Sequence, residues 1–183
     1  MPRKLVLKMS VSVDGFVGRN DGDVQWIFPS LDEELQEWMV DRLGQAGAHL
    51  MGRITYGDMA AYWPTSEEPY AAPMNDIPKV VFSRTLSEGS WAPTTVVRGD
   101  LATEIGRLKN AQDAGEADLL AHGGVGFARA LVQRDLVDEY CLVIHPVALG
   151  SGLPLFTAPT GLRLLSSEPF PGGALAVTYA PAR

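Results

Sequence analysis

The stretch His49-Leu-Met-Gly-Arg-Ile-Thr-Tyr-Gly-Asp-Met59 decides how the rest of the chain is interpreted. It begins as an apolar run, breaks at Gly52, and places Arg53 and Thr55 in the next few positions. A short buried strand that ends at a glycine and passes into a helix is typical of an α/β sheet. Two interpretations of its end stay open. One is an ordinary strand-to-helix turn, and the other is a place where helix amides and a cation hold a phosphate.

The segments on either side alternate between predicted strands and predicted helices. Strands are expected at 4–13, 48–51, 79–83, 94–97, 117–121 and 136–147, and helices at 31–43, 53–61, 100–114 and 127–133. An antiparallel hairpin is expected from 162–168 and 174–179. We therefore predict a single α/β domain over residues 1–183. Its mainly parallel central sheet would have eight to nine strands flanked by helices and end in the C-terminal hairpin.

Details of this assignment concern the first strand, one helix start and two connecting segments. In residues 4–13 one face carries Leu5, Leu7, Met9, Val11 and Val13, and the other carries Lys8, Ser10 and Ser12. Ser30 is the predicted N-cap of the first helix, with Glu33 completing a capping box. Residues 18–30 are expected to form a loop, and residues 62–77, rich in Pro, Ser and Glu, a surface excursion.

Composition limits the classes of function. Apolar residues make up 46% of the 183 residues and charged residues 20%, which is an ordinary globular composition. The net charge of -7, with no Lys/Arg run, argues against nucleic-acid binding. Cys141 is the only cysteine, so no intrachain disulfide can form, which fits a reducing cytoplasm. The apolar run near the N-terminus is too short and too interrupted for a signal peptide, and the sequence has no apolar run of about 18 residues. We therefore expect neither a signal peptide nor a membrane segment.

Special residues follow four predicted strands, at the carboxyl ends where open α/β sheets bind ligands. These segments are Gly52-Arg53-Ile-Thr55, Ser83-Arg84-Thr85, His122-Gly123-Gly124-Val125-Gly126 and Asp14-Gly15. Each segment can also be explained without a ligand, as an ordinary turn or as an exposed loop arginine. Together the first three favour a dinucleotide, although the spacing is not that of GxGxxG. Helix amides with Arg53 would hold phosphate, and Ser83 with Arg84 would hold the extra phosphate of NADP.

The remaining candidates are acids, histidines and tryptophans. Asp14 could contact a substrate or order its own loop through an Asx-turn. Asp32, Glu33 and Glu34 open the first helix, and one of them could serve as proton donor or substrate anchor. The three histidines lack metal-ligand spacing, so no zinc site is expected. Trp26 is most simply a core anchor, although a planar heterocycle would also stack on it.

The order of these pieces resembles the dihydrofolate reductase-like superfamily. It is most similar to the C-terminal reductase domain of the bifunctional riboflavin-biosynthesis protein and its stand-alone bacterial relatives. The segments that carry the resemblance are Ser10-Val-Ser-Val-Asp-Gly15, Leu50-Met-Gly-Arg-Ile-Thr-Tyr56, Val81-Phe-Ser-Arg84, Gly123-Gly124 before a helix, Leu136-Val-Asp-Glu-Tyr140, and His145-Pro-Val-Ala-Leu-Gly-Ser-Gly152 leading into Pro154-Leu-Phe156. They cover nearly the whole chain in the family's order.

The resemblance implies NADPH as hydride donor and assigns roles by position. Gly52, Arg53 and Thr55 would hold cofactor phosphate, and Ser83 and Arg84 the ribose phosphate. Gly123, Gly124, Val125 and Gly126 would lie under the pyrophosphate and nicotinamide. Asp14 would face the substrate, with Trp26 beside it. The run Trp26-Ile-Phe-Pro29-Ser-Leu-Asp32 is similar to the pterin-binding run of dihydrofolate reductases, with its acid one residue late. Asp32 would be the catalytic acid, with Glu33 and Glu34 as alternatives.

The resulting hypothesis is an NADPH-dependent reductase of a small planar heterocycle or a ribosylaminopyrimidine-type substrate. One alternative is a nucleotide-binding module or sensor with no turnover, and another is a scaffold with an empty cleft. A homodimer is also expected, with residues 136–147 and 153–156 as the subunit contact or, equally, as ordinary core.

Overall fold

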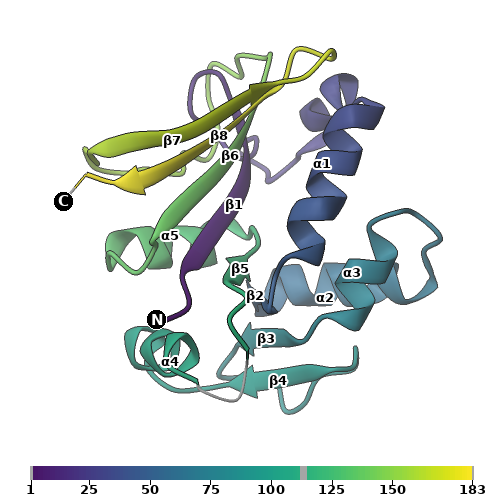
Figure 1. Cartoon of the computed structure of the whole chain (residues 1–183), viewed down its shortest axis with the longest axis vertical. Helices are drawn as coiled ribbons and strands as arrows, with labels where there is room; N and C mark the ends of the chain where they lie inside the picture. The colour runs from purple at the N-terminus through teal and green to yellow at the C-terminus, as the bar shows by residue number, and fades with distance from the viewer. Residues whose placement is uncertain (1, 112–114, 183) are drawn as a thin grey trace.

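The computed structural model describes residues 2–111 and 115–182, which form one eight-stranded sheet with helices on both faces (Figure 1). The strands are β1 (Leu5–Ser12), β2 (Ala48–Gly52), β3 (Lys79–Phe82), β4 (Thr94–Val97), β5 (Leu119–Ala121), β6 (Glu139–His145), β7 (Leu162–Pro169) and β8 (Leu175–Pro181). The helices are α1 (Glu33–Gly44), α2 (Arg53–Tyr62), α3 (Ala71–Asp76), α4 (Leu101–Lys109) and α5 (Val125–Gln133), with two short 3-10 helices, η1 (Gln25–Ser30) and η2 (Trp63–Thr65).

The strand order is β4-β3-β2-β5-β1-β6-β8-β7. The pairs from β4 to β6 are parallel, whereas β8 pairs with β6 and β7 pairs with β8 in antiparallel fashion. The predicted fold class is therefore confirmed, with eight strands and a C-terminal antiparallel pair. Because parallel neighbours point the same way, the carboxyl ends of six strands share one edge of the sheet.

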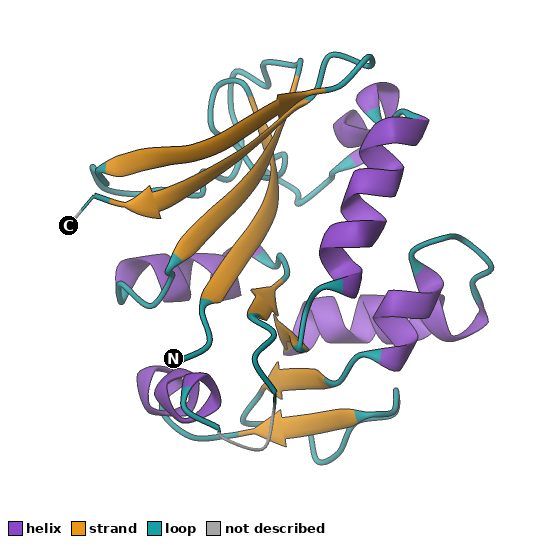
Figure 2. Cartoon of the chain, in the orientation of Figure 1, coloured by secondary structure: helices purple, strands orange, loops and turns teal. Residues whose placement is uncertain are grey.

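Helices α1, α2 and α3 cover one face of the sheet, and α4 and α5 cover the other (Figure 2). On the first face Leu43, Tyr56 and Met74 pack against strand residues such as Val6 and Met51. On the second, apolar residues of α4 and α5 pack against the opposite side of the same strands. Burial on both faces is the reason why the central strands are nearly continuous apolar runs.

The face of β1 that carries Lys8, Ser10 and Ser12 is thus covered by helices. Val6 on this face packs against α1 and α2, and Ser12 is buried. Val13, which was expected on the apolar face of the strand, lies beyond its end and is 60% exposed. Ser12 therefore lies in the interior of the protein, whereas Lys8 and Ser10 keep part of their surface exposed.

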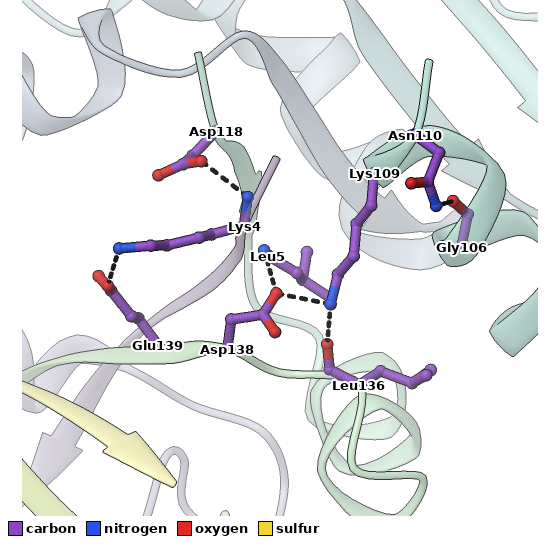
Figure 3. Close-up of polar contacts among 9 residues, drawn as sticks. All are labelled: Lys4, Leu5, Gly106, Lys109, Asn110, Asp118, Leu136, Asp138 and Glu139. Atoms are coloured by element: carbon purple, nitrogen blue, oxygen red, sulfur yellow. Dashed lines mark hydrogen bonds and ion pairs between the residues drawn. The ribbon is translucent and has the colours of Figure 1, made fainter. Parts of the chain in front are cut away.

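Carboxylates occupy the amino edge of the sheet (Figure 3). Asp118 accepts a hydrogen bond from the backbone N–H of Lys4 at 2.7 Å, and Asp138 accepts one from the N–H of Leu5 at 2.8 Å. The ammonium of Lys109 forms an ion pair with Asp138 at 2.5 Å. Backbone donors at the start of β1 are in this way satisfied within the chain, which leaves the carboxyl edge as the place to search for a ligand site.

The predicted start of the first helix is wrong. Helix α1 begins at Glu33 with Asp32 as its N-cap, and the Asp32 carboxylate accepts the N–H of Leu35 at 2.8 Å. Ser30 instead ends η1, which lies within the predicted loop. A capping-box pattern cannot distinguish Ser30 from Asp32, because both are good N-caps and only packing of the preceding turn selects one.

Three other boundaries differ from the prediction. The predicted excursion at 62–77 contains η2 and α3, because Ala71 and Met74 find a buried place against α1 and α2. Helix α4 ends at Lys109, and residues 112–114 of its predicted extension lie outside the described residues. Strand β6 is shorter than predicted and begins after a turn in which Asp135 has a positive φ.

The segments considered for a subunit contact lie in the interior. Strand β6 is flanked by β1 and β8, and Leu155 is 1% exposed. The alternative interpretation of these segments as ordinary core is the one that the structure supports, and the homodimer stays a prediction.

Candidate functional site

The carboxyl ends of β2, β3 and β5 bring the predicted phosphate-binding residues to one edge. Gly52 is in register with Phe82, so Arg53 and the Ser83-Arg84 pair follow neighbouring strands. Strand β5 pairs with β2 on its other side and leads through His122 into the glycines. We call this region the phosphate edge and define it by Gly52, Arg53, Thr55, Ser83, Arg84 and Gly123–Gly126.

Two helix N-termini meet at the phosphate edge. Gly52 and Gly124 are the N-caps of α2 and α5, and neither helix has a side-chain cap. Gly124 has a φ of 95°, and a Cβ there would lie 2.5 Å from Thr55 Oγ1. A Cβ on Gly52 would lie 3.3 Å from the Cβ of Phe127. The first turns of the two helices are therefore in close contact, and their free N–H groups and dipoles favour a shared anion.

The remaining glycine-segment residues extend this surface toward the centre of the sheet. A Cβ on Gly123 would lie 3.4 Å from the sulfur of Met9, which places this backbone over β1. Val125 and Gly126 form the first turn of α5, and the position of a Cβ on Gly126 is open space. The backbone here is accessible to a flat group without a side chain in the way.

A hollow of about 210 Å³ adjoins the phosphate edge beyond β3 and β4. It is lined by Phe82, Ser83, Arg84, Val97, Arg98, Gly99, Asp100, Leu101, Phe127 and Arg134. The rings of Phe82 and Phe127 lie 5.1 Å apart and connect it to the start of α5. We call this hollow the arginine pocket, because the three guanidinium groups of Arg84, Arg98 and Arg134, which follow the ends of β3, β4 and α5, border one small space.

The polar groups of the arginine pocket retain capacity for an anion. Ser83 Oγ accepts the N–H groups of Thr85 and Leu86, so its own proton is available to donate. Arg84, like Arg53 nearby, makes no hydrogen bond or ion pair with any residue that the structure describes. Arg98 donates 2.7 Å hydrogen bonds to two backbone carbonyls, which fix its position but leave its charge uncompensated.

The one carboxylate that lines the arginine pocket is committed to a helix. Asp100 is the N-cap of α4 and accepts the N–H of Thr103 at 3.0 Å. This hydrogen bond, with a smaller contribution from Arg134, lowers the pKa of Asp100. The charge balance of the pocket is positive, as a phosphate subsite requires.

The ends of β1 and β6 form the other half of the carboxyl edge. His145, the last residue of β6, lies with its Nδ1 2.8 Å from Ser30 Oγ of η1. The ring of Trp26 meets the His145 ring edge-on, with centroids 5.7 Å apart. Burial, assisted by the charge of Lys8, lowers the pKa of His145 to about 4. We call this group of side chains, comprising Lys8, Trp26, Ser30 and His145, the His145 cluster.

Lys8 is the charged group of this region. Burial lowers its pKa, and its ammonium makes no hydrogen bond or ion pair with the residues that the structure describes. The same ammonium lowers the pKa of His49 and His122 as well as that of His145. Lys8 therefore lies between β5 and β6, within electrostatic reach of both halves of the edge.

A buried histidine pair supports the phosphate edge from inside. His122 Nε2 lies 2.8 Å from His49 Nδ1, and His49 Nε2 lies 3.1 Å from the carbonyl oxygen of Pro73. Because a carbonyl only accepts, His49 carries its proton on Nε2, and His122 donates to the bare Nδ1. Burial lowers the pKa of His49 to about 4 and that of His122 well below its ordinary value. Within residues 2–111 and 115–182, three or more potential metal ligands do not gather anywhere.

The two predicted acids are both held by backbone N–H groups. Asp14 accepts the Ser12 hydroxyl at 2.6 Å and the N–H groups of Leu149 and Gly150, and these bonds, the Ser12 bond foremost, lower its pKa. Asp32 accepts the N–H of Leu35 with one oxygen and that of Gly172 with the other. The geometry gives both carboxylates a role in fixing loops, and their predicted contacts with a substrate stay predictions.

Sequence reasoning missed Lys8, Ser30, Arg98, Arg134 and His145. A signal existed for Lys8, because a lysine within an apolar strand that is buried on both faces is unusual. No comparable signal marked Arg98 or Arg134, since each is one ordinary residue near the end of a helix or strand. His145 was noted as part of a family segment and as a histidine without metal-ligand spacing, but it was given no role in the site. They were assigned to the site only when the fold had placed their elements together.

The described part of the chain contains no helix that combines the length and apolar character needed to span a bilayer.

Comparison with known proteins relates this geometry to a family. The chain is 29% identical to the uncharacterized protein YyaP of Bacillus subtilis (strain 168), over 97% of this chain and 94% of that protein. The crystal structure of a putative riboflavin biosynthesis protein from Shewanella sp. PV-4 superposes with a TM-score of 0.78 at 23% identity and covers both chains completely. The diaminohydroxyphosphoribosylaminopyrimidine deaminase/5-amino-6-(5-phosphoribosylamino)uracil reductase of Thermotoga maritima superposes with a TM-score of 0.70 at 16% identity, over 99% of this chain and 57% of that one.

These likenesses agree with the resemblance seen in the sequence and with the fold. The model of the family described as "RibD C-terminal domain" matches residues 3–176, nearly the full length. The chain belongs to the RibD C-terminal domain family.

Proposed function

We propose that this protein is an NADPH-dependent reductase that transfers hydride to a small planar heterocycle or a ribosylaminopyrimidine-type substrate. The observation that carries the proposal is the arginine pocket beside two uncapped helix N-termini. Family membership supports it, and the Thermotoga maritima relative is named as a uracil reductase.

The phosphate edge fits the anionic part of the cofactor. Ser83, Arg84, Arg98 and Arg134 would hold the ribose phosphate, because each offers a donor or a charge to the same small space. The free N–H groups at the starts of α2 and α5, with the Thr55 hydroxyl, would hold the pyrophosphate. A side chain at Gly124 would fill this space, which agrees with a close approach of ligand to backbone. The bound cofactor supplies the hydride.

The substrate would lie at the carboxyl ends of β1 and β6, next to the His145 cluster. The unpaired Lys8 ammonium of this cluster can hold a carbonyl or ring nitrogen of the acceptor and polarise it toward hydride addition. Trp26 is buried and holds the His145 ring in place through its edge contact. In this proposal Asp14 and Asp32 are positioning residues, which hold the 149–150 loop and the start of α1.

Calorimetric titration with NADPH and NADH tests the proposal. Wild-type protein should bind NADPH more tightly than NADH. Substitution Arg84→Ala or Arg134→Ala should remove about ten- to a hundred-fold of that preference, since a charged hydrogen bond contributes about 1.5–3 kcal/mol. Binding of NADH should hardly change, because it lacks the extra phosphate.

The matched control is Arg163→Ala, which removes an exposed arginine from β7 at the opposite end of the sheet. It should bind both nucleotides as wild type does. Equally weak binding of NADPH and NADH by the wild-type protein would reject the proposal. Tight NADPH binding without oxidation by any pterin, aminopyrimidine or quinone would instead favour a nucleotide-binding module.

A further inference from the structure

Strand β7 forms one edge of the sheet and is open to solvent. It pairs with β8 on one side only, and seven of its eight residues are exposed. Figure 1 shows it on the outer side of β8. Its exposed residues include Leu164 and Leu165, with exposed fractions of 52% and 42%. The strand at the opposite edge, β4, has only four residues and is partly buried. A long exposed edge that carries apolar side chains is a surface for pairing with another strand.

The register with β8 shows which side chains of β7 share a face of the sheet. Arg163 and Glu168 both lie opposite even-numbered residues of β8, whereas Leu164 and Ser167 lie opposite odd-numbered residues. In a regular strand, residues five positions apart point to opposite faces. Leu165 has no partner on β8, and the register shifts at this position. This bulge therefore brings the side chains of Arg163 and Glu168 to the same face of the sheet.

The charges of β7 complement those of a second copy of the same strand. Two copies can pair in antiparallel fashion about a two-fold axis that passes near Ser166. In this register Arg163 of each copy lies opposite Glu168 of the other on one face, and Leu164 lies opposite Ser167 on the other face. The axis repeats each contact, so two cross-strand pairs of opposite charge form. Neither charged side chain forms an ion pair within residues 2–111 and 115–182.

We infer that β7 is the surface through which two copies of this chain form a homodimer. The self-complementary charges identify a second copy as the partner, and they select one register, because a slip along the strand separates both charge pairs. A two-fold contact uses this edge in both copies, so assembly through it stops at the dimer. The contact differs from the 136–147 and 153–156 segments considered from the sequence. It is also independent of the proposed function, since β7 and the phosphate edge lie at opposite ends of the sheet.

Sedimentation equilibrium of the full-length protein tests the inference. At about 10–100 μM the wild-type protein should have twice the 19.7 kDa mass of one chain. Arg163→Glu and Glu168→Arg each place like charges opposite one another twice per dimer. Each should raise the dissociation constant of the dimer by about ten-fold or more. The double variant Arg163→Glu/Glu168→Arg restores opposite charges and should recover the dimer. The matched control Glu88→Arg changes an exposed carboxylate after β3 and should dimerise as wild type does.

Cross-linking through Ser166→Cys gives a second, independent measure. Opposite residues of an antiparallel pair have Cα atoms about 4.5–5.5 Å apart, which a disulfide can bridge. With oxidised glutathione this variant should form a covalent dimer. Ser87→Cys, in an exposed segment after β3, should remain a single chain under the same conditions. Cys141 is buried and does not compete. This variant retains a test if a charge-reversed chain fails to fold.

The inference is overturned if the wild-type protein is a monomer throughout this concentration range, or if its dimer tolerates both single charge reversals. It is also overturned if the folded double variant stays monomeric, or if Ser166→Cys forms no covalent dimer. Failure of the proposed function has a different signature. It would appear in the titrations with NADPH and NADH, whatever the mass of the protein in solution.

Discussion

The two halves of the carboxyl edge differ in the chemical groups that they present. One presents mainly main-chain atoms, and the other presents side chains. The phosphate edge consists of free backbone N–H groups and glycines at the starts of α2 and α5, with the exposed guanidinium groups of Arg53 and Arg84. The His145 cluster consists of side chains contributed by β1, η1 and β6, of which Trp26, Ser30 and His145 are buried. The phosphate edge would bind the cofactor through backbone N–H groups and exposed charges. The other half would bind the substrate beside side chains that are largely shielded from water.

This difference has energetic consequences. Backbone amides and arginines keep their protonation state across the accessible pH range, so the phosphate edge has little dependence on pH. Buried imidazoles and a buried ammonium are held away from their ordinary pKa values, and a change of protonation there alters stability. We therefore expect three separate effects. Acid should lower the stability, a substitution at a backbone-determining glycine should weaken NADPH binding, and a substitution of a loop-holding carboxylate should lower the stability slightly.

Acid should produce the largest effect, through the buried histidines. Their folded-state pKa values lie below 6.5, and those of His49 and His145 are about 4. The unfolded chain therefore binds more protons between pH 6.5 and about 4, and the free energy of unfolding falls as pH falls through this window. Each histidine contributes at most about 1.4 kcal/mol per pH unit.

Urea unfolding at several pH values measures this loss, and His49→Gln is the matched variant. Removing one titrating group should make the decrease between pH 6.5 and about 4 shallower in the variant. If the free energy of unfolding depends on pH in the same way in wild type and variant, the pKa of the His49 imidazole does not change on unfolding, which contradicts the prediction.

Substitution Gly124→Ala should have the next largest effect, confined to the phosphate edge. The added Cβ would clash with Thr55 Oγ1, and the φ of 95° is unfavourable for alanine. Strain of about 1–3 kcal/mol should weaken NADPH binding by about ten-fold or more, measured by calorimetry. The control is Gly57→Ala in α2, where a Cβ meets open space. It should leave binding unchanged, and equal binding by both variants would contradict the proposed close contact.

Asp32 should give the smallest effect and test the predicted catalytic acid. In Asp32→Ala both carboxylate contacts with backbone N–H groups are lost, so unfolding free energy should fall by about 1–2 kcal/mol. Asp32→Asn should retain most of the stability, because asparagine is also a good N-cap. Thermal unfolding measures both variants.

A different outcome for Asp32→Asn would restore the prediction made from the sequence. If its stability is unchanged but NADPH oxidation with any accepted substrate falls by about a hundred-fold or more, Asp32 acts as a proton donor. Retained turnover would support the positioning role.

The sequence-based prediction was accurate where local sequence patterns determine the structure, and it failed where packing between distant segments determines it. The strand ends that carry Gly52 and Gly124 were identified because a glycine between an apolar run and a helix is a local pattern. Helix α3 was missed because its burial depends on contacts with α1 and α2, which the short polar stretch does not reveal. The N-cap was assigned to Ser30 instead of Asp32, because η1 forms by packing and not by local propensity.

The sequence by itself determined the fold class, the mainly parallel character of the sheet and the strand ends that carry Gly52, Arg53, Ser83, Arg84 and the glycines at 123–126. These depend on periodicity and on glycine positions, which are properties of short segments. Only the tertiary structure decided that Arg98 and Arg134 border one pocket with Arg84, and that Ser30 contacts the ring of His145. Contacts between residues about a hundred positions apart are set by sheet order and packing, and no local pattern records them.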